Sequence, residues 1–145
     1  MKKILSTMLV FVVSLSLAGV AIAASPKPPA NICFNTVQSQ DVEFSLLIKR
    51  MGTIKMSGGP EKIYSVQGLY YDPTSGPGTV IGSGYMDGSV FHFSLNGVYT
   101  WQGLAGYFQA DAYWNVDTKA GPIYTFWDST THVTWSLEEV SCKKQ

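Results

Sequence analysis

Charged residues and cysteines are both scarce in this sequence, and their scarcity excludes several kinds of protein. Only 14% of the 145 residues are charged, and no extended run of Lys and Arg is present to bind the phosphates of a nucleic acid. The two cysteines, Cys33 and Cys142, do not have the Cys-x-x-Cys spacing of a redox motif, and two thiols alone do not complete a zinc site. We therefore expect no nucleic-acid partner, no metal and no cofactor.

Motifs for catalysis are missing as well. The sequence has no G-x-S-x-G motif. The segment at residues 141–144 matches Ser-x-x-Lys only in its letters, because that motif needs the start of a buried helix. The two histidines, His92 and His132, alternate with apolar residues and fall on the polar face of their segments. We expect no catalytic residues and no enzyme activity; the alternative is a small hydrolase that uses His92 or His132.

One long apolar run is present, and it lies at the N-terminus. Residues 1–3 are basic at two positions, residues 4–17 are apolar apart from Ser and Thr, and Ala21-Ile22-Ala23 offers the small residues that signal peptidase accepts. This pattern predicts a signal peptide of the bacterial Sec type over residues 1–23 and a periplasmic or extracellular protein. The alternative is a retained membrane anchor, but no basic stop-transfer segment follows, so we expect no stable membrane span after cleavage.

The chain that remains after cleavage has the length of one domain. Removing 23 of the 145 residues leaves 122, and the loss of Lys2 and Lys3 leaves eight basic residues against ten acidic ones, a net charge of −2. A chain of this length can form one hydrophobic core. Residues 24–30 are rich in proline and predict a flexible lead-in. We expect a single β domain over residues 31–145.

Cys33 and Cys142 lie near the two ends of this domain, with a separation of 109 residues. Cysteines of exported proteins usually pair. In the chain-entropy model, a bond that closes a loop of this length stabilises the fold by about 4–5 kcal/mol. We predict a structural disulfide that ties the first strand to the last, which is favourable if those strands are neighbours.

Apolar and polar residues alternate with a period of two through the domain. In the clearest stretch, residues 104–117, Phe108 and Trp114 share one face while Tyr107 and Tyr113 share the other. Strict alternation is typical of half-buried antiparallel strands. The pairs at residues 87–88 (Asp-Gly) and 96–97 (Asn-Gly) have the composition of tight hairpin turns. We expect about eight strands, over residues 31–38, 41–49, 61–71, 78–86, 89–96, 104–116, 122–128 and 131–141.

This pattern predicts an all-β fold, either a small antiparallel β-barrel of about eight strands or a β-sandwich, closed by one disulfide. Glycines inside the strands favour bends where a sheet curls; they are Gly68, Gly82, Gly84 and Gly106. In strand count, alternation and size the chain resembles the small calycin-type barrels, among them the avidins and lipocalins. Exported alternating strands are also typical of outer-membrane barrels, but several strands here are short for such a span.

Aromatic side chains supply the candidate binding residues. An eight-stranded barrel either fills its interior with side chains or keeps room for one small ligand. The candidates on the apolar face are Phe44, Phe91, Phe93, Phe108, Trp114 and Trp135. On or near the polar face, Tyr107, Tyr113 and Trp127 are candidates for binding a partner protein.

We expect from these candidates a non-enzymatic barrel that holds a small apolar or aromatic ligand. The alternative is a structural or protein-interaction module that uses the exposed Tyr and Trp side chains. The sequence does not indicate an oligomeric state.

Overall fold

The computed structural model describes residues 26–37, 42–57, 59–127 and 132–142. The predicted signal peptide, residues 1–23, lies outside the described residues. Residues 26–30 of the lead-in have no regular secondary structure, and the Ala30 carbonyl accepts a hydrogen bond of 2.7 Å from the Ile48 N–H. The described part of the chain contains no helix long and apolar enough to cross a membrane.

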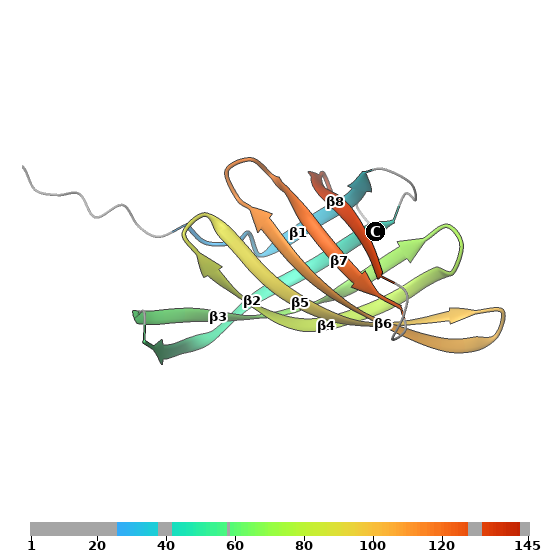
Figure 1. The fold of residues 1–145 in the computed structure, drawn as a ribbon, viewed down its shortest axis with the longest axis horizontal. Coiled ribbons are helices and arrows are strands. Elements are labelled where there is room, and N and C mark those ends of the chain that lie inside the picture. The colour runs from blue at the N-terminus through green and yellow to red at the C-terminus, as the bar shows by residue number, and fades with distance from the viewer. Residues whose placement is uncertain (1–25, 38–41, 58, 128–131, 143–145) are drawn as a thin grey trace, which may run out of the picture.

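Eight antiparallel strands form one closed sheet (Figure 1). Each strand pairs with the next along the chain, and the last pairs with the first, so the predicted all-β barrel is confirmed. The predicted turn at residues 87–88 connects the fourth and fifth strands, and Gly88 there has a φ of 55°. The strands are β1 (Asn31–Val37), β2 (Glu43–Met56), β3 (Gly59–Asp72), β4 (Gly76–Asp87), β5 (Val90–Trp101), β6 (Leu104–Asn115), β7 (Ala120–Phe126) and β8 (His132–Val140).

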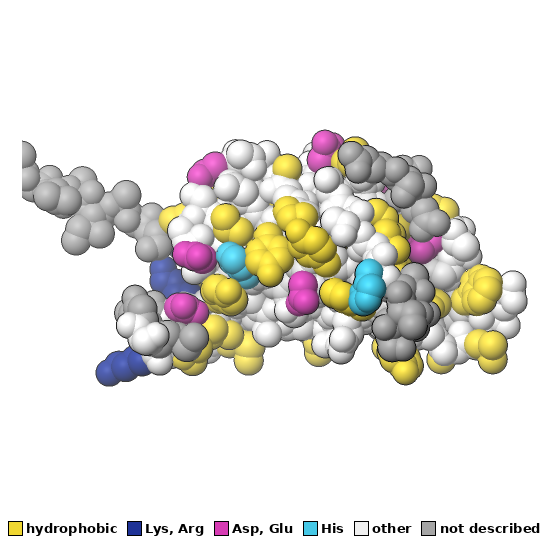
Figure 2. Space-filling view, viewed as in Figure 1, with side chains coloured by type: hydrophobic (Ala, Val, Ile, Leu, Met, Phe, Trp, Pro, Cys, Tyr) yellow, Lys and Arg dark blue, Asp and Glu magenta, His cyan; other side chains and the backbone are white. Residues whose placement is uncertain are grey.

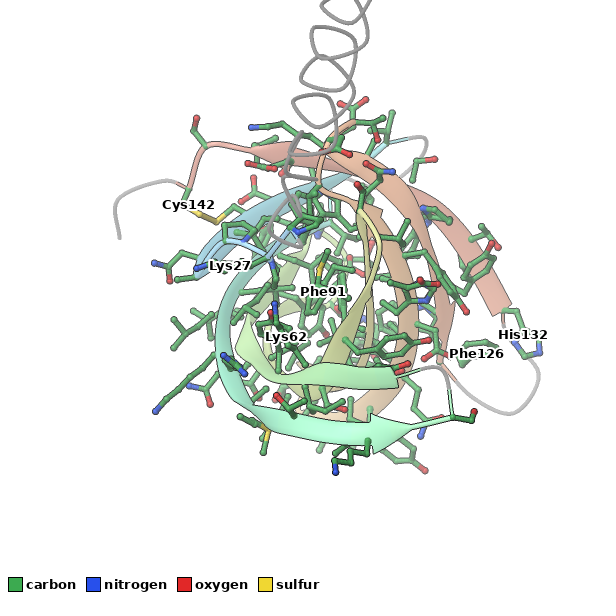
Figure 3. The ribbon with its side chains drawn as sticks, turned by 90° about the vertical axis from the view of Figure 1, so that its left-hand side faces the viewer. Lys27, Lys62, Phe91, Phe126, His132 and Cys142 are labelled. Carbon is green, nitrogen blue, oxygen red and sulfur yellow. A yellow bond between two sulfur atoms is a disulfide. The ribbon has the colours of Figure 1, made fainter. Side chains whose placement is uncertain are left out.

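The seam between the two ends of the chain is closed by strand pairing and by a disulfide. Cys33 in β1 lies opposite Val140 in β8. Cys142, just beyond the end of β8, is bonded to Cys33, with the two Cα atoms 5.2 Å apart. Figure 3 shows this bond at the periphery of the barrel. The predicted disulfide between the first and last strands is therefore confirmed.

Alternate side chains of each strand point into the barrel, and aromatic rings fill its centre. Phe91, which lies inside the ring of strands in Figure 3, is fully buried. The centroid of its ring lies 5.3 Å from that of Phe93 and 5.7 Å from that of Tyr64. Across the barrel, Phe34 packs edge to face on Trp114 at 5.6 Å. Rings at these separations are in direct contact, so the middle of the barrel is a packed core.

Two strands are longer than the sequence pattern indicates. β2 continues to Met56 rather than ending at residue 49, and β3 begins at Gly59 rather than at residue 61. The register shifts between Arg50 and Gly52, which marks a β-bulge. Most described side chains of this extension are exposed on both faces. The extension therefore has no buried face to impose the alternation by which strands are recognised in a sequence.

The prediction of a tight turn at residues 96–97 is wrong. β5 runs through this pair, and the chain turns instead at Gln102 and Gly103, with φ values of 51° and 80°. Gly97 is buried, and a Cβ atom on it would overlap the ring of Phe108. Glycine at this position makes room for an aromatic ring of the next strand and does not form a turn.

Removing the disulfide tests how much the covalent link between β1 and the end of β8 contributes to stability. In the double variant Cys33→Ser, Cys142→Ser, we expect the free energy of unfolding to fall by about 4 kcal/mol, because the unfolded chain is no longer closed into a loop. Urea unfolding followed by Trp fluorescence measures the change. The wild-type protein unfolded under reducing conditions is the control and should match the variant. A variant as stable as the oxidised wild type would contradict this account.

Candidate functional site

One end of the barrel gathers the ends of all eight strands. β1, β3, β5 and β7 end there, and β2, β4, β6 and β8 begin there. The β3–β4 and β5–β6 hairpins project from this end, on the right-hand side of Figure 1. The strand ends surround an open pocket of about 500 Å³, which we call the mouth pocket. Its volume falls within the range of about 300–1,000 Å³ that is usual for small-molecule sites. It is lined by Asp72, Thr74, Ser75, Tyr99, Trp101, Trp127, Val133 and Trp135.

Four of the eight residues that line the mouth pocket are aromatic. Trp127 meets Tyr99 edge to face, with ring centroids 5.4 Å apart and an interplanar angle of 74°. It meets Trp135 in the same way, at 6.3 Å and 69°. Beneath it, Phe108 lies 4.7 Å away at 32°. Trp101 stands at the rim and is 48% exposed. The pocket is therefore bounded by flat apolar surfaces at steep angles to one another.

A buried hydroxyl holds Trp127 in place. The Trp127 Nε1–H donates a hydrogen bond of 3.2 Å to the Thr125 Oγ1, and that hydroxyl in turn donates to the Val133 carbonyl at 3.2 Å. Thr125 has no exposed surface. Because the indole N–H has a fixed partner inside the barrel, the orientation of the ring is set by the fold.

The polar side of the mouth pocket is the turn between β3 and β4. The Asp72 Oδ1 accepts hydrogen bonds from the backbone N–H groups of Thr74 at 2.6 Å and Ser75 at 3.4 Å. Asp72 is 4% exposed. Its carboxylate therefore holds the turn together from inside, as Asp commonly does in turns of this kind.

Tyr70 lies next to this turn, on the inward face of β3. Its ring packs edge to face on Phe108 at 4.9 Å and occupies the space that a Cβ atom on Gly78 would need. The Tyr70 hydroxyl is buried and lies next to the hydroxyl of Ser75, whose Oγ is buried as well. Burial raises the pKa of Tyr70 to about 12; the neighbouring Ser75 hydroxyl opposes this rise, and the Asp72 carboxylate adds to it.

The six aromatic residues that the sequence offered as ligand-binding residues all lie on the inward face. Each belongs to the same buried cluster, which contains Phe44, Phe91, Phe93, Phe108, Trp114 and Trp135. Trp135 also lines the mouth pocket, and Phe108 supports its wall from the core side. The other four contribute to the packed interior, and their role in binding stays a prediction.

The three residues offered as partner-binding residues are separated by the fold. Tyr107 is 76% exposed and Tyr113 is 42% exposed, both on the outward face of β6. Trp127 does not join them, which corrects its expected place on or near the polar face. Trp127 is the first residue after β7, and it lies two and four positions beyond the buried Thr125 and Ile123. It therefore lies on the same, inward side of the sheet, and its ring packs against the core.

The two histidines lie on the outside of the barrel, in strands that are not neighbours. His92 in β5 stacks on Tyr85 at 4.8 Å and meets Tyr113 edge to face at 4.8 Å. His132, at the start of β8, packs on Phe126 at 4.9 Å, as Figure 3 shows. Figure 2 shows apolar side chains gathered between the two histidines. Among the residues that the structure describes, no three His, Cys, Asp or Glu side chains come together to hold a metal ion.

Sequence reasoning missed Asp72, Ser75, Tyr99 and Trp101 as pocket residues. A signal was present in the turn composition of residues 72–78 and in the aromatic residues near the ends of segments. It could be interpreted only with the strand order known, because the four residues come from two hairpins that are distant in sequence. A comparison with family models, curated proteins and solved structures finds no match to this chain.

Alkaline pH tests the burial of the Tyr70 phenol. Between pH 10 and pH 12 the unfolded chain loses this proton and the folded chain keeps it, since its pKa is raised to about 12. Stability therefore falls as pH rises through this window, by up to about 1.4 kcal/mol per pH unit from this group. We expect Tyr70→Phe to gain about 1.4 kcal/mol relative to wild type between pH 8 and pH 11.

Urea unfolding at the two pH values measures this gain. Tyr71→Phe, at the neighbouring and half-exposed position, is the matched control and should show no comparable gain. An identical difference between Tyr70→Phe and wild type at pH 8 and pH 11 would show that the phenol is not shielded.

Proposed function

We propose that this protein is an exported, non-enzymatic β-barrel that holds one small, ring-containing apolar or aromatic ligand in the mouth pocket. The observation that carries the proposal is the arrangement of Tyr99, Trp127 and Trp135 around one open space at the end of a filled barrel. Small-molecule sites are concave, mostly apolar and completed by a few polar groups. The mouth pocket has this composition, with Asp72 and Ser75 as its polar side.

The fixed orientation of Trp127 supports binding of a rigid ligand. A side chain that is already ordered loses little conformational freedom when a ligand packs on it, so more of the contact energy appears as affinity. The bond from the Trp127 indole to Thr125 provides that order, and Phe108 supports the ring from behind. The filled middle of the barrel supports a position for the ligand at the mouth, because side chains occupy the interior.

Native mass spectrometry of protein recovered from its own exported compartment tests the proposal. We expect a bound mass that is lost on denaturation, because a preorganised apolar pocket retains its ligand during purification. In Thr125→Val, where the side-chain volume is kept and the indole loses its acceptor, we expect the occupied fraction to fall at least threefold. The matched control is Tyr113→Phe on the outer face, which should keep wild-type occupancy. Folded wild-type protein without bound mass would contradict the proposal.

A second candidate function is association with another copy of the chain through the outer face of β3 to β6. Among the residues of β4 and β5, Asp87 alone is charged. Large apolar side chains stand exposed on this face: Leu69 at 45%, Ile81 at 65%, Val98 at 54% and Tyr107 at 76%. In register, Leu69 lies opposite Thr79, which pairs with Val98, which pairs with Tyr107. A surface poor in charge and rich in Tyr and aliphatic groups is typical of the core of an interface.

The same spectra test this second candidate. A mass at a whole multiple of the monomer is expected if the outer face joins two copies. The double variant Ile81→Ser, Tyr107→Ser should return the protein to the monomer mass, while Tyr85→Ser, further along β4, serves as the control. A wild-type protein that is monomeric at micromolar concentration would contradict self-association through this face.

A further inference from the structure

The mouth pocket brings a carboxylate together with aromatic rings. Among its eight lining residues, Asp72 is the one that carries a charge. The aromatic ones are Tyr99, Trp101, Trp127 and Trp135. The face of an aromatic ring carries partial negative charge, so a cation placed over it is attracted, most strongly by Trp. The rings and the carboxylate therefore favour the same kind of group, which is positively charged and has an apolar surface.

The rings of this pocket are set at steep angles to one another. The plane of Trp127 makes an angle of 74° with that of Tyr99 and of 69° with that of Trp135. The Trp127 N–H, a donor that would repel a cation, is turned away from the pocket toward the buried Thr125 hydroxyl. The pocket therefore meets the ring carbons of this indole. Several aromatic rings around one space are typical of sites for quaternary ammonium groups.

No Lys or Arg side chain within the described ranges pairs with the Asp72 carboxylate. Asp72 is 4% exposed, and the ion pair that the described residues form joins Lys119 to Glu139. The Asp72 Oδ1 accepts two backbone hydrogen bonds in the β3–β4 turn, but the side-chain oxygen of a neutral Asn can accept such bonds as well. The turn thus needs the oxygen and not the charge. Because a buried charge without an opposite charge is unfavourable, a cation in the pocket would supply what the fold does not.

Basic side chains are absent from the mouth end of the described chain. The six described Lys and Arg residues precede β1, occupy the middle and far half of β2, lie near the start of β3 or follow β6. Each of these places is in the middle of the barrel or at the end opposite to the mouth, and the basic side chains visible in Figure 2 lie at that end, on the left. They are Lys27, Lys49, Arg50, Lys55, Lys62 and Lys119. A cation that enters the mouth pocket therefore meets no repulsion from a neighbouring basic group among the described residues.

We propose that the mouth pocket binds an organic cation, whose ammonium group lies against the rings of Tyr99, Trp127 and Trp135 and is balanced by Asp72. This inference rests on the proposed function and names its ligand class: a ring compound that carries a protonated or quaternary amine. Trp101, half-exposed at the rim, is placed to pack on the ring of such a ligand. The apolar part of the ligand contacts the aromatic wall, and its charge provides the selectivity.

Two probes of the same shape separate charge from apolar contact. The first, para-tert-butylbenzyl alcohol, is neutral. The second, para-(hydroxymethyl)phenyltrimethylammonium, has a positively charged nitrogen in place of the quaternary carbon. Isothermal titration calorimetry of the disulfide-bonded protein measures the affinity for each probe. Indole N–H signals in nuclear magnetic resonance spectra, compared with those of Trp127→Phe, report whether the probe contacts the pocket wall.

We expect the trimethylammonium probe to bind at least about tenfold more tightly than the neutral probe, because the rings and the carboxylate attract its charge. In Asp72→Asn this ratio should fall at least about threefold, while the affinity for the neutral probe is unchanged. Glu43→Gln is the matched control and should keep the ratio, since it removes the same charge at the same end of the barrel from a residue that does not line the mouth pocket. Unchanged binding of the neutral probe shows that Asp72→Asn is folded.

The ratio measured for the wild type tests the proposal without any variant. Equal affinity for the two probes, or tighter binding of the neutral one, would overturn the cation site and leave the proposed function standing, because a ring compound still binds. A ratio that is unchanged in Asp72→Asn, or that falls equally in Glu43→Gln, would overturn the role of Asp72 as the balancing charge. If neither probe binds, the proposed function itself fails, and the cation site fails with it.

Discussion

Closure of the sheet by the pairing of β1 with β8 is the constraint on which the rest of this structure depends. It removes the two open edges that an eight-stranded sheet would otherwise present, and the Cys33–Cys142 bond holds the same seam covalently. An eight-stranded barrel has an interior just wide enough to be filled by side chains. Closure therefore determines that the centre of the barrel is packed with side chains. It also determines that the mouth pocket lies at the end of the barrel, beyond the last inward side chains of the strands.

Phe108 connects the core to the mouth pocket. Its ring contacts Tyr70 on one side at 4.9 Å and Trp127 on the other at 4.7 Å, and it fits against the wall only because Gly97 has no Cβ atom. The aromatic wall and Tyr70 thus share one support. A pocket built in this way is rigid on its inner side, while its outer side is the β3–β4 turn.

Much of the fold could be predicted from the sequence because alternation records burial directly. The inward positions of Phe91, Phe93 and Trp114 follow from a period of two, and the disulfide was predicted from two cysteines in a chain whose first 23 residues have the pattern of a signal peptide. The turn predicted at residues 96–97 failed for a physical reason. The composition of a tight turn and the need for a residue without a Cβ atom both select glycine, and the sequence does not distinguish them. The prediction put Trp127 on the wrong side of the sheet. This residue lies beyond the last residue of β7, where strand alternation no longer determines which side of the sheet a side chain faces.

The amino-acid sequence by itself determined the strand class, the inward face of most strands and the paired cysteines, since each depends on residues that are close in the chain or on composition alone. Tertiary structure decided which residues meet at the mouth pocket. Asp72, Ser75, Tyr99, Trp127 and Trp135 come from four segments spread over more than sixty positions of the chain. They meet only because antiparallel strands of a closed barrel bring every second connection to the same end. That meeting depends on strand order and register, which are set by long-range pairing and cannot be deduced from any one segment.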